Sequence, residues 1–99
     1  MSPAATNPQA YSLKGMTGMT NKEKYDGAFT SSLEVTADQL PGLAYQAIPA
    51  WDSVGHMTLV AAIEDAFDIM MDTDDIIDLS SYERGMEILS KDEYGVDFA

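Results

Sequence analysis

The sequence predicts an all-α fold, a small four-helix bundle with three main helices and a short third helix. Two observations carry this prediction. Residues 53–67 place apolar side chains at helical spacing on one face, and two segments open with a Ser or Thr followed three residues later by Glu, the capping-box pattern. No segment shows a convincing strand pattern. With 99 residues, the chain has room for one domain with a modest core.

The folded domain is expected to begin after an N-terminal extension. Residues 1–19 are rich in Pro, Ala, Thr, Gly and Asn without apolar periodicity, which predicts disorder. The folded domain is expected over residues 20–90. Its first helix begins at Thr20, which has capping-box spacing to Glu23. One stripe of this helix should face the core: Tyr25, Phe29 and Leu33.

A long connection over residues 34–51 follows, carrying Pro41, Gly42 and Pro49. A loop of this length in a small domain is unusual and suggests a functional role. Five of its side chains are expected to anchor it to the core: Leu40, Leu43, Tyr45, Ile48 and Trp51.

The second helix, from Ser53 to Phe67, has the clearest pattern. Its apolar face consists of Leu59, Val60, Ile63 and Phe67, and its polar side carries Thr58, Glu64 and Asp65. These positions predict a helix with one buried face.

A short helix is expected over residues 73–78, with three apolar residues facing inward: Ile76, Ile77 and Leu79. Ser80 and Glu83 have capping-box spacing and should open the last helix. Its inward side chains are expected to be Tyr82, Met86 and Leu89. Residues 91–99 are acidic and should form a frayed tail.

Charge and composition narrow the classes of function. The formal net charge is -12, from 17 acidic and 5 basic residues. This charge argues against nucleic acid as a partner and favours proteins with basic patches. The chain has no cysteine, which removes disulfides and a protein thiol nucleophile. No apolar run is long enough to span a membrane and no secretion signal opens the chain, so we expect a soluble, cytoplasmic monomer.

Asp52 and Ser53 lie where the long loop meets the second helix. Either residue type is a preferred helix N-cap, and on spacing alone a capping role is the more general explanation. The context adds a second interpretation. An apolar strip of Val54, Met57 and Ala61 leads away from the serine, with carboxylates along the same helix, and a cap needs neither.

This region resembles the acyl carrier protein family. Residues 52–69 (DSVGHMTLVAAIEDAFDI) are similar to the second helix of that family, which starts with Asp-Ser-Leu and continues as an apolar and acidic helix. The likeness extends through residues 72–83 (DTDDIIDLSSYE) and covers residues 48–90 well. The chain departs from the family pattern at Val54, Trp51 and the pair Gly55-His56. These departures point to a specialised standalone member.

The resemblance implies that Ser53 carries a 4'-phosphopantetheine arm, transferred from coenzyme A by a phosphopantetheinyl transferase, with Asp52 supporting the modification. The protein would itself be no enzyme. It would hold acyl groups as thioesters and deliver them to acyl-loading and acyl-using enzymes of fatty-acid, lipid, polysaccharide or secondary-metabolite synthesis. The expected partner-binding residues are Val54, Met57, Ala61, Glu64 and Asp65. The expected lining of an acyl cavity is Leu59, Val60, Ile63, Leu79 and Tyr82.

Two alternatives stay open: an aminoacyl or peptidyl carrier with the same arm, and an unmodified acidic helical module that binds a basic partner. A hydrolase built on His56 is disfavoured because the chain lacks a nucleophile elbow, and we expect His56 to be exposed beside the arm. Trp51 is expected either to cap the core near the arm or to anchor the loop. The acidic run at residues 72–78 has Ile77 where a calcium loop needs glycine, so no metal site is predicted.

Overall fold

Four α-helices form the body of the part of the chain that the structure describes. The structure, a computed structural model, describes residues 19–98. The elements are α2 (Asn21–Leu33), the 3₁₀ turn η1 (Ala37–Gln39), α3 (Ser53–Phe67), α4 (Thr73–Asp78) and α5 (Tyr82–Leu89). Within this described span there is no strand, only an isolated antiparallel bridge between Ala44 and Ser81. The all-α prediction is therefore confirmed, whereas the expectation for the N-terminal extension lies, Met19 apart, outside the described residues.

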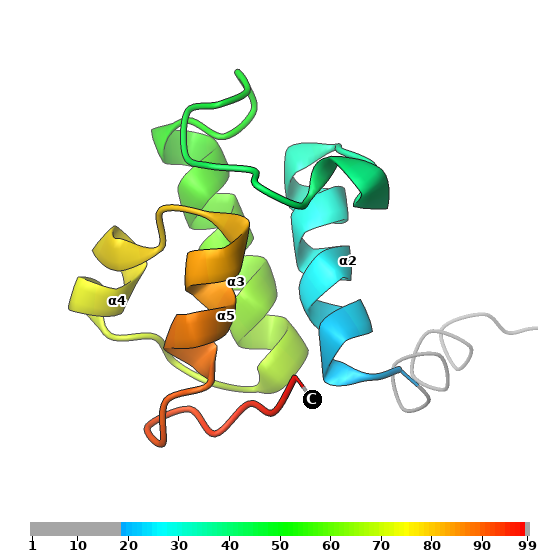
Figure 1. Ribbon diagram of the computed structural model, residues 1–99. Coiled ribbons are helices and arrows are strands. Elements are labelled where there is room, and N and C mark those ends of the chain that lie inside the picture. The colour runs from blue at the N-terminus through cyan, green and yellow to red at the C-terminus, as the bar shows by residue number, and fades with distance from the viewer. Residues whose placement is uncertain (1–18, 99) are drawn as a thin grey trace, which may run out of the picture.

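Helix α2 starts as the sequence predicts. Thr20 Oγ1 accepts a hydrogen bond from the Glu23 N–H at 3.1 Å, and the Glu23 carboxylate accepts one from the Thr20 N–H at 2.9 Å. Both bonds satisfy donors that a helix end leaves unpaired. The predicted stripe of Tyr25, Phe29 and Leu33 is buried. Helix α2 runs antiparallel to α3, and α5 lies in front of them (Figure 1).

Aromatic rings fill the centre of the core. Tyr25 packs against Phe29 and Tyr82 with ring centroids 4.9 and 5.3 Å apart. Its hydroxyl donates to the backbone carbonyl of Tyr82 at 2.6 Å. At Gly85, a Cβ atom would lie 2.0 Å from this same hydroxyl. Helix α5 can therefore approach α2 this closely only because it carries glycine there.

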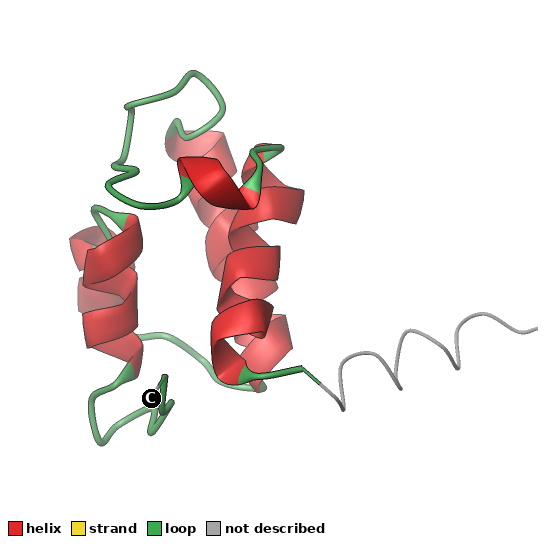
Figure 2. Ribbon diagram, turned by 45° about the vertical axis from the view of Figure 1, so that its right-hand side comes forward, coloured by secondary structure: helices red, strands yellow, loops and turns green. Residues whose placement is uncertain are grey.

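The long connection between α2 and α3 packs onto the body at one end of the bundle (Figure 2). Leu40, Leu43 and Trp51 are buried, as predicted for anchors. The Tyr45 N–H donates to the Ser80 carbonyl and the Tyr82 N–H donates to the Leu43 carbonyl, both at 2.9 Å. These bonds join the loop to the segment that leads into α5.

Helix α4 differs from its prediction. Its bounds are as expected, but Ile77 is 74% exposed, while Asp75 is buried with 7% of its surface exposed. Asp75 is accommodated because Lys91 Nζ and the Tyr94 hydroxyl each donate to its carboxylate at 2.6 Å. A pattern of apolar residues in so short a helix could not reveal these distant partners.

The start of α5 also needs a correction. Its N-cap is Ser81, whose Oγ accepts from the Arg84 N–H at 3.0 Å, and not Ser80. The Glu83 carboxylate reaches the long loop instead, accepting from the Gly42 N–H at 2.9 Å. The tertiary contact with the loop thus replaces the local capping box.

The C-terminal segment packs on the core. Val96 is buried, its N–H donates to the Leu89 carbonyl at 2.9 Å, and the Phe98 ring lies 5.3 Å from that of Tyr25. Asn21 Nδ2 donates to the Asp97 carbonyl at 2.9 Å, so the segment crosses to the start of α2. This packing differs from the frayed tail expected over residues 91–99. The acidic residues of this segment (Asp92, Glu93 and Asp97) concealed the alternating apolar side chains of Tyr94, Val96 and Phe98.

Candidate functional site

The candidate site is the N-terminal end of α3, where Asp52 acts as the helix cap. Asp52 Oδ1 accepts a hydrogen bond from the Gly55 N–H at 2.8 Å. The capping role expected from residue type is therefore present. A role for Asp52 in modification of the neighbouring serine stays a prediction.

Ser53 is the first residue of α3 and is exposed. Its Oγ lies 3.3 Å from the hydroxyl of Tyr45, which comes from the long loop. The first N–H groups of a helix have no acceptor within the helix. Asp52 accepts the hydrogen bond of the Gly55 N–H. The N–H groups of Ser53 and Val54 have no acceptor within the helix, and the positive end of the helix dipole favours an anion near them.

Gly55 allows the loop to pass directly over the first turn of α3. A Cβ atom at this position would lie 1.9 Å from the carbonyl oxygen of Ala50. No other residue fits without displacing the backbone. Gly55 is one of the positions at which the sequence departs from the acyl carrier pattern. The close approach of the loop gives a steric reason for a glycine there.

His56 is half-buried and bonded through both ring nitrogens, so its predicted exposure beside the arm is wrong. The Trp51 Nε1–H donates to Nδ1 at 2.9 Å, which leaves Nε2–H to donate to the Ile76 carbonyl at 2.7 Å. Because the acceptor nitrogen is already occupied, His56 is not available to take a proton from Ser53. Trp51 is fully buried, so it both anchors the loop and closes the core at this end.

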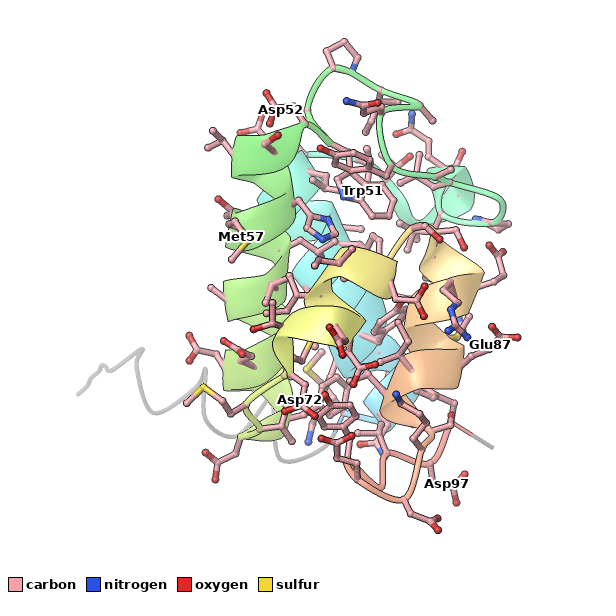
Figure 3. All side chains as sticks on the ribbon, turned by 90° about the vertical axis from the view of Figure 1, so that its left-hand side faces the viewer. Trp51, Asp52, Met57, Asp72, Glu87 and Asp97 are labelled. Atoms are coloured by element: carbon pink, nitrogen blue, oxygen red, sulfur yellow. The ribbon has the colours of Figure 1, made fainter. Side chains whose placement is uncertain are left out.

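The apolar strip of α3 is open to solvent. Val54 is 75% and Met57 is 53% exposed, and Ala61 is exposed as well. Met57 projects away from the body, further along α3 than Asp52 (Figure 3). This exposure is what a docking surface requires, whereas the docking role itself stays a prediction.

The two predicted carboxylates of the strip lie in different surroundings. Asp65 is exposed. Glu64 is half-buried, and its carboxylate accepts from the Met71 N–H at 2.9 Å, bracing the turn after α3. Of these two residues, only Asp65 presents a carboxylate without a hydrogen bond to another described residue.

The five predicted cavity-lining residues are all core residues: Leu59, Val60, Ile63, Leu79 and Tyr82. A cavity of about 240 Å³ does lie near Ser53, with the lining Tyr45, His56, Ile77, Leu79 and Ser80. Only Leu79 belongs to both sets. The other members come from the loop, the first turn of α3, α4 and the segment after it, and no local sequence pattern indicates that these parts meet.

Two further hollows lie away from the serine. One, of about 310 Å³, runs between α2 and α3 and includes Lys24, Gly27 and Ala62 in its lining. The other, of about 380 Å³, is lined by polar residues of α4 and the tail. Neither includes a residue of the α3 N-terminus.

An acidic cluster of Asp72, Asp75 and Glu93 lies at the polar hollow, with carboxylate oxygens within 4.8 Å of one another. Hydrogen bonds from Lys91 and then Tyr94 hold the pKa of Asp75 below its usual value. Glu93 behaves oppositely: a hydrogen bond with Asp72, together with partial desolvation and nearby carboxylates, raises its pKa. The positive charge of Lys91 is thus already committed to Asp75.

The comparisons with known proteins identify no family for this chain. No protein-family model matches the chain, and no curated protein or solved structure shows significant similarity to it. None of the helices in residues 19–98 is long and apolar enough to cross a membrane.

Proposed function

We propose that this protein is a carrier of the acyl carrier type, with Ser53 as the attachment point for a 4'-phosphopantetheine arm. The observation that carries the proposal is the exposed Ser53 hydroxyl at the first position of α3, directly after the Asp52 cap. In this role Ser53 Oγ forms a bond to the phosphorus of coenzyme A nearest the pantetheine. The bond from that phosphorus to the adenosine bisphosphate breaks, and the serine proton passes to a base on the transferase.

The residues around Ser53 suit a phosphodiester. The N–H groups of Ser53 and Val54 and the partial positive charge of the helix end favour a negative group there. The Asp52 carboxylate accepts a hydrogen bond from the Gly55 N–H at 2.8 Å. This bond offsets part of its negative charge and so reduces its repulsion of an incoming phosphate. The thiol that holds the cargo would come with the arm, which agrees with a chain that has no cysteine.

The partners would be enzymes that receive α3 on an apolar patch bordered by basic residues. Val54, Met57 and Ala61 supply the apolar contact. Asp65 and the net charge of -12 supply electrostatic steering. Such contacts allow fast and reversible docking, which a carrier that visits several enzymes needs.

The test is loading by a broad-specificity phosphopantetheinyl transferase with coenzyme A and magnesium, followed by intact-mass measurement. The wild-type chain should gain the mass of one phosphopantetheine. Ser53→Ala should fold normally, because the side chain is exposed, and should gain nothing. Ser90→Ala, at the far end of the molecule, is the matched control and should load like the wild type.

A wild-type chain that gains no mass, or a Ser53→Ala chain that still does, would refute the assignment. Tight binding of the unloaded chain to a basic protein would then favour an acidic interaction module. Among loaded proteins isolated from the native host, the mass of the cargo distinguishes an acyl carrier from an aminoacyl or peptidyl carrier.

A further inference from the structure

Tyr45 is restrained by its backbone and by two neighbouring rings although it lies in a loop. Its backbone N–H donates to the Ser80 carbonyl at 2.9 Å. Its ring makes edge contacts with Trp51, at 6.3 Å between centroids, and with His56, at 5.3 Å. Those two rings are themselves joined by the hydrogen bond of 2.9 Å between Trp51 and His56. The phenol therefore has one defined position.

The backbone next to Tyr45 adds to this restraint. Gln46 adopts a left-handed conformation with φ of 67°, and its N–H donates to the Trp51 carbonyl at 2.9 Å. A non-glycine residue in this region is strained and persists only where its surroundings hold it. The loop is thus folded back so that Tyr45 faces the start of α3.

The hydroxyl of Tyr45 lies 3.3 Å from Ser53 Oγ, and in the unmodified protein either oxygen can donate. An ester oxygen has no proton, and a phosphodiester only accepts hydrogen bonds. Once Ser53 is esterified, Tyr45 can act only as the donor. Its hydroxyl is then within reach of the phosphate oxygens, which lie two bonds beyond Oγ.

Few other side chains are available to meet a negative group at this point. Of the four basic residues in the described span, Lys22, Arg84 and Lys91 are in ion pairs with carboxylates. The fourth, Lys24, lines the hollow between α2 and α3. At the N-terminal end of α3, the described residues therefore offer a hydroxyl donor rather than a cation.

We propose that Tyr45 is a positioning residue that donates a hydrogen bond to the phosphodiester on Ser53 and directs the arm into the adjoining cavity. The inference rests on the proposed carrier function. Tyr45 also forms a wall of the cavity of about 240 Å³ that His56, Ile77, Leu79 and Ser80 complete. A phosphodiester bonded to Tyr45 starts the arm at the mouth of this cavity, whereas a free one leaves the arm in solvent.

The first test compares the ³¹P NMR signal of three loaded proteins: wild type, Tyr45→Phe and Tyr82→Phe. Tyr45→Phe keeps the ring and removes only the hydroxyl, so it should fold and load normally. Its phosphodiester signal should shift and sharpen because the hydrogen bond is lost. Tyr82→Phe removes a hydroxyl that is bonded to Asp26 on α2, and it should leave the signal where the wild type has it.

The second test measures how well the thioester is protected. Each protein is loaded with octanoyl-4'-phosphopantetheine from octanoyl-coenzyme A and treated with hydroxylamine. The Tyr45→Phe thioester should be cleaved roughly three- to tenfold faster than the wild-type thioester, the factor expected for loss of one ordinary hydrogen bond. Tyr82→Phe should react at the wild-type rate.

The outcomes separate this inference from the proposed function. If Ser53 accepts the arm but Tyr45→Phe leaves both the ³¹P signal and the hydroxylamine rate unchanged, the positioning role is wrong and the carrier function stands. If Ser53 accepts no arm in any of the proteins, the carrier function and the inference fail together.

Discussion

The two ends of α3 are held by different interactions. At the N-terminal end, Trp51, His56 and Tyr45 form hydrogen bonds and ring contacts, and no ion pair of the described residues involves this end. At the opposite end, where α4 meets the tail, Asp75 is buried against Lys91 and Tyr94. Figure 3 shows the two ends, with Trp51 and Asp52 at one and Asp72 and Asp97 at the other.

The interactions that position the site are therefore distinct from the interactions that depend on the charge of the molecule. The cluster of Asp72, Asp75 and Glu93 brings like charges close together in an acidic chain. Its contribution to stability therefore depends on which of these carboxylates are ionised. The site is positioned by steric fit, ring contacts and hydrogen bonds, including the one to the Asp52 carboxylate, and by no ion pair of the described residues. Changes to the cluster should therefore alter stability without moving Ser53, while changes in the first turn of α3 should do both.

Gly55→Ala should have the largest effect, because its methyl group would overlap the Ala50 carbonyl, 1.9 Å away. Backbone must move to relieve this clash, and we expect the free energy of unfolding to fall by about 3 kcal/mol. Urea denaturation measures the change. Loading at Ser53 should slow as well, since Ser53 lies in the same first turn of α3 that the clash displaces.

Gly27→Ala is the matched control, since a Cβ at Gly27 meets nothing within 4 Å. In the middle of α2, alanine should stabilise the protein by about 0.5–1 kcal/mol. If Gly55→Ala were as stable as wild type, the close passage of the loop over α3 would be wrong.

Asp75→Asn tests the other end and should have an intermediate effect. It removes the charge that Lys91 and Tyr94 bind, and we expect a loss of about 2 kcal/mol at pH 7, as for hydrogen bonds to charged groups. The folded-state pKa of Asp75 is lowered, so its contribution is complete above the unfolded pKa of about 3.9. That contribution disappears as the pH falls through the folded pKa.

Denaturation curves from pH 7 down to pH 3 check this dependence. The difference between wild type and Asp75→Asn should shrink below about pH 4. The exposed neighbour Asp74 provides the control Asp74→Asn, which should change stability little at any pH. A loss that stays constant down to pH 3 would show that the ionised carboxylate is not what Asp75 contributes.

The sequence predicts the helices well because their signals are local. The bounds of α3 and the capping box at Thr20 depend on spacing within one or two turns, and both are confirmed. The exposed strip of Val54 and Met57 follows from the same periodicity. Local pattern therefore sufficed for the elements and for the exposed face of the site.

The misses share another cause, which is pairing between distant residues. His56 is drawn inward by Trp51 and the Ile76 carbonyl, and Asp75 by Lys91. Ser81 rather than Ser80 caps α5, and the Glu83 carboxylate accepts from the Gly42 N–H on the loop. Such contacts join segments across the fold, so neither residue type nor spacing reveals them.

Glu93→Gln should produce the smallest effect, of opposite sign to Asp75→Asn. The pKa of Glu93 is raised by its hydrogen bond with Asp72 and by the surrounding carboxylates, so at pH 7 its charge opposes folding. Glutamine removes the charge and keeps hydrogen-bonding groups, and we expect a small rise in Tm, of roughly 1–2 °C. The gain should shrink as the pH falls through the raised folded pKa, because folded wild-type Glu93 then becomes neutral too, and it should vanish below the unfolded pKa of about 4.3.

Thermal melts of Glu93→Gln beside Asp92→Asn distinguish this local repulsion from the general benefit of lowering the net charge of -12. Asp92 is exposed in the same tail and belongs to no cluster of three carboxylates in the described residues. An equal rise in Tm for both variants would mean that overall charge, not the geometry of the cluster, limits stability at this end. A rise confined to Glu93→Gln would place the repulsion at the cluster, since the two variants change the net charge equally.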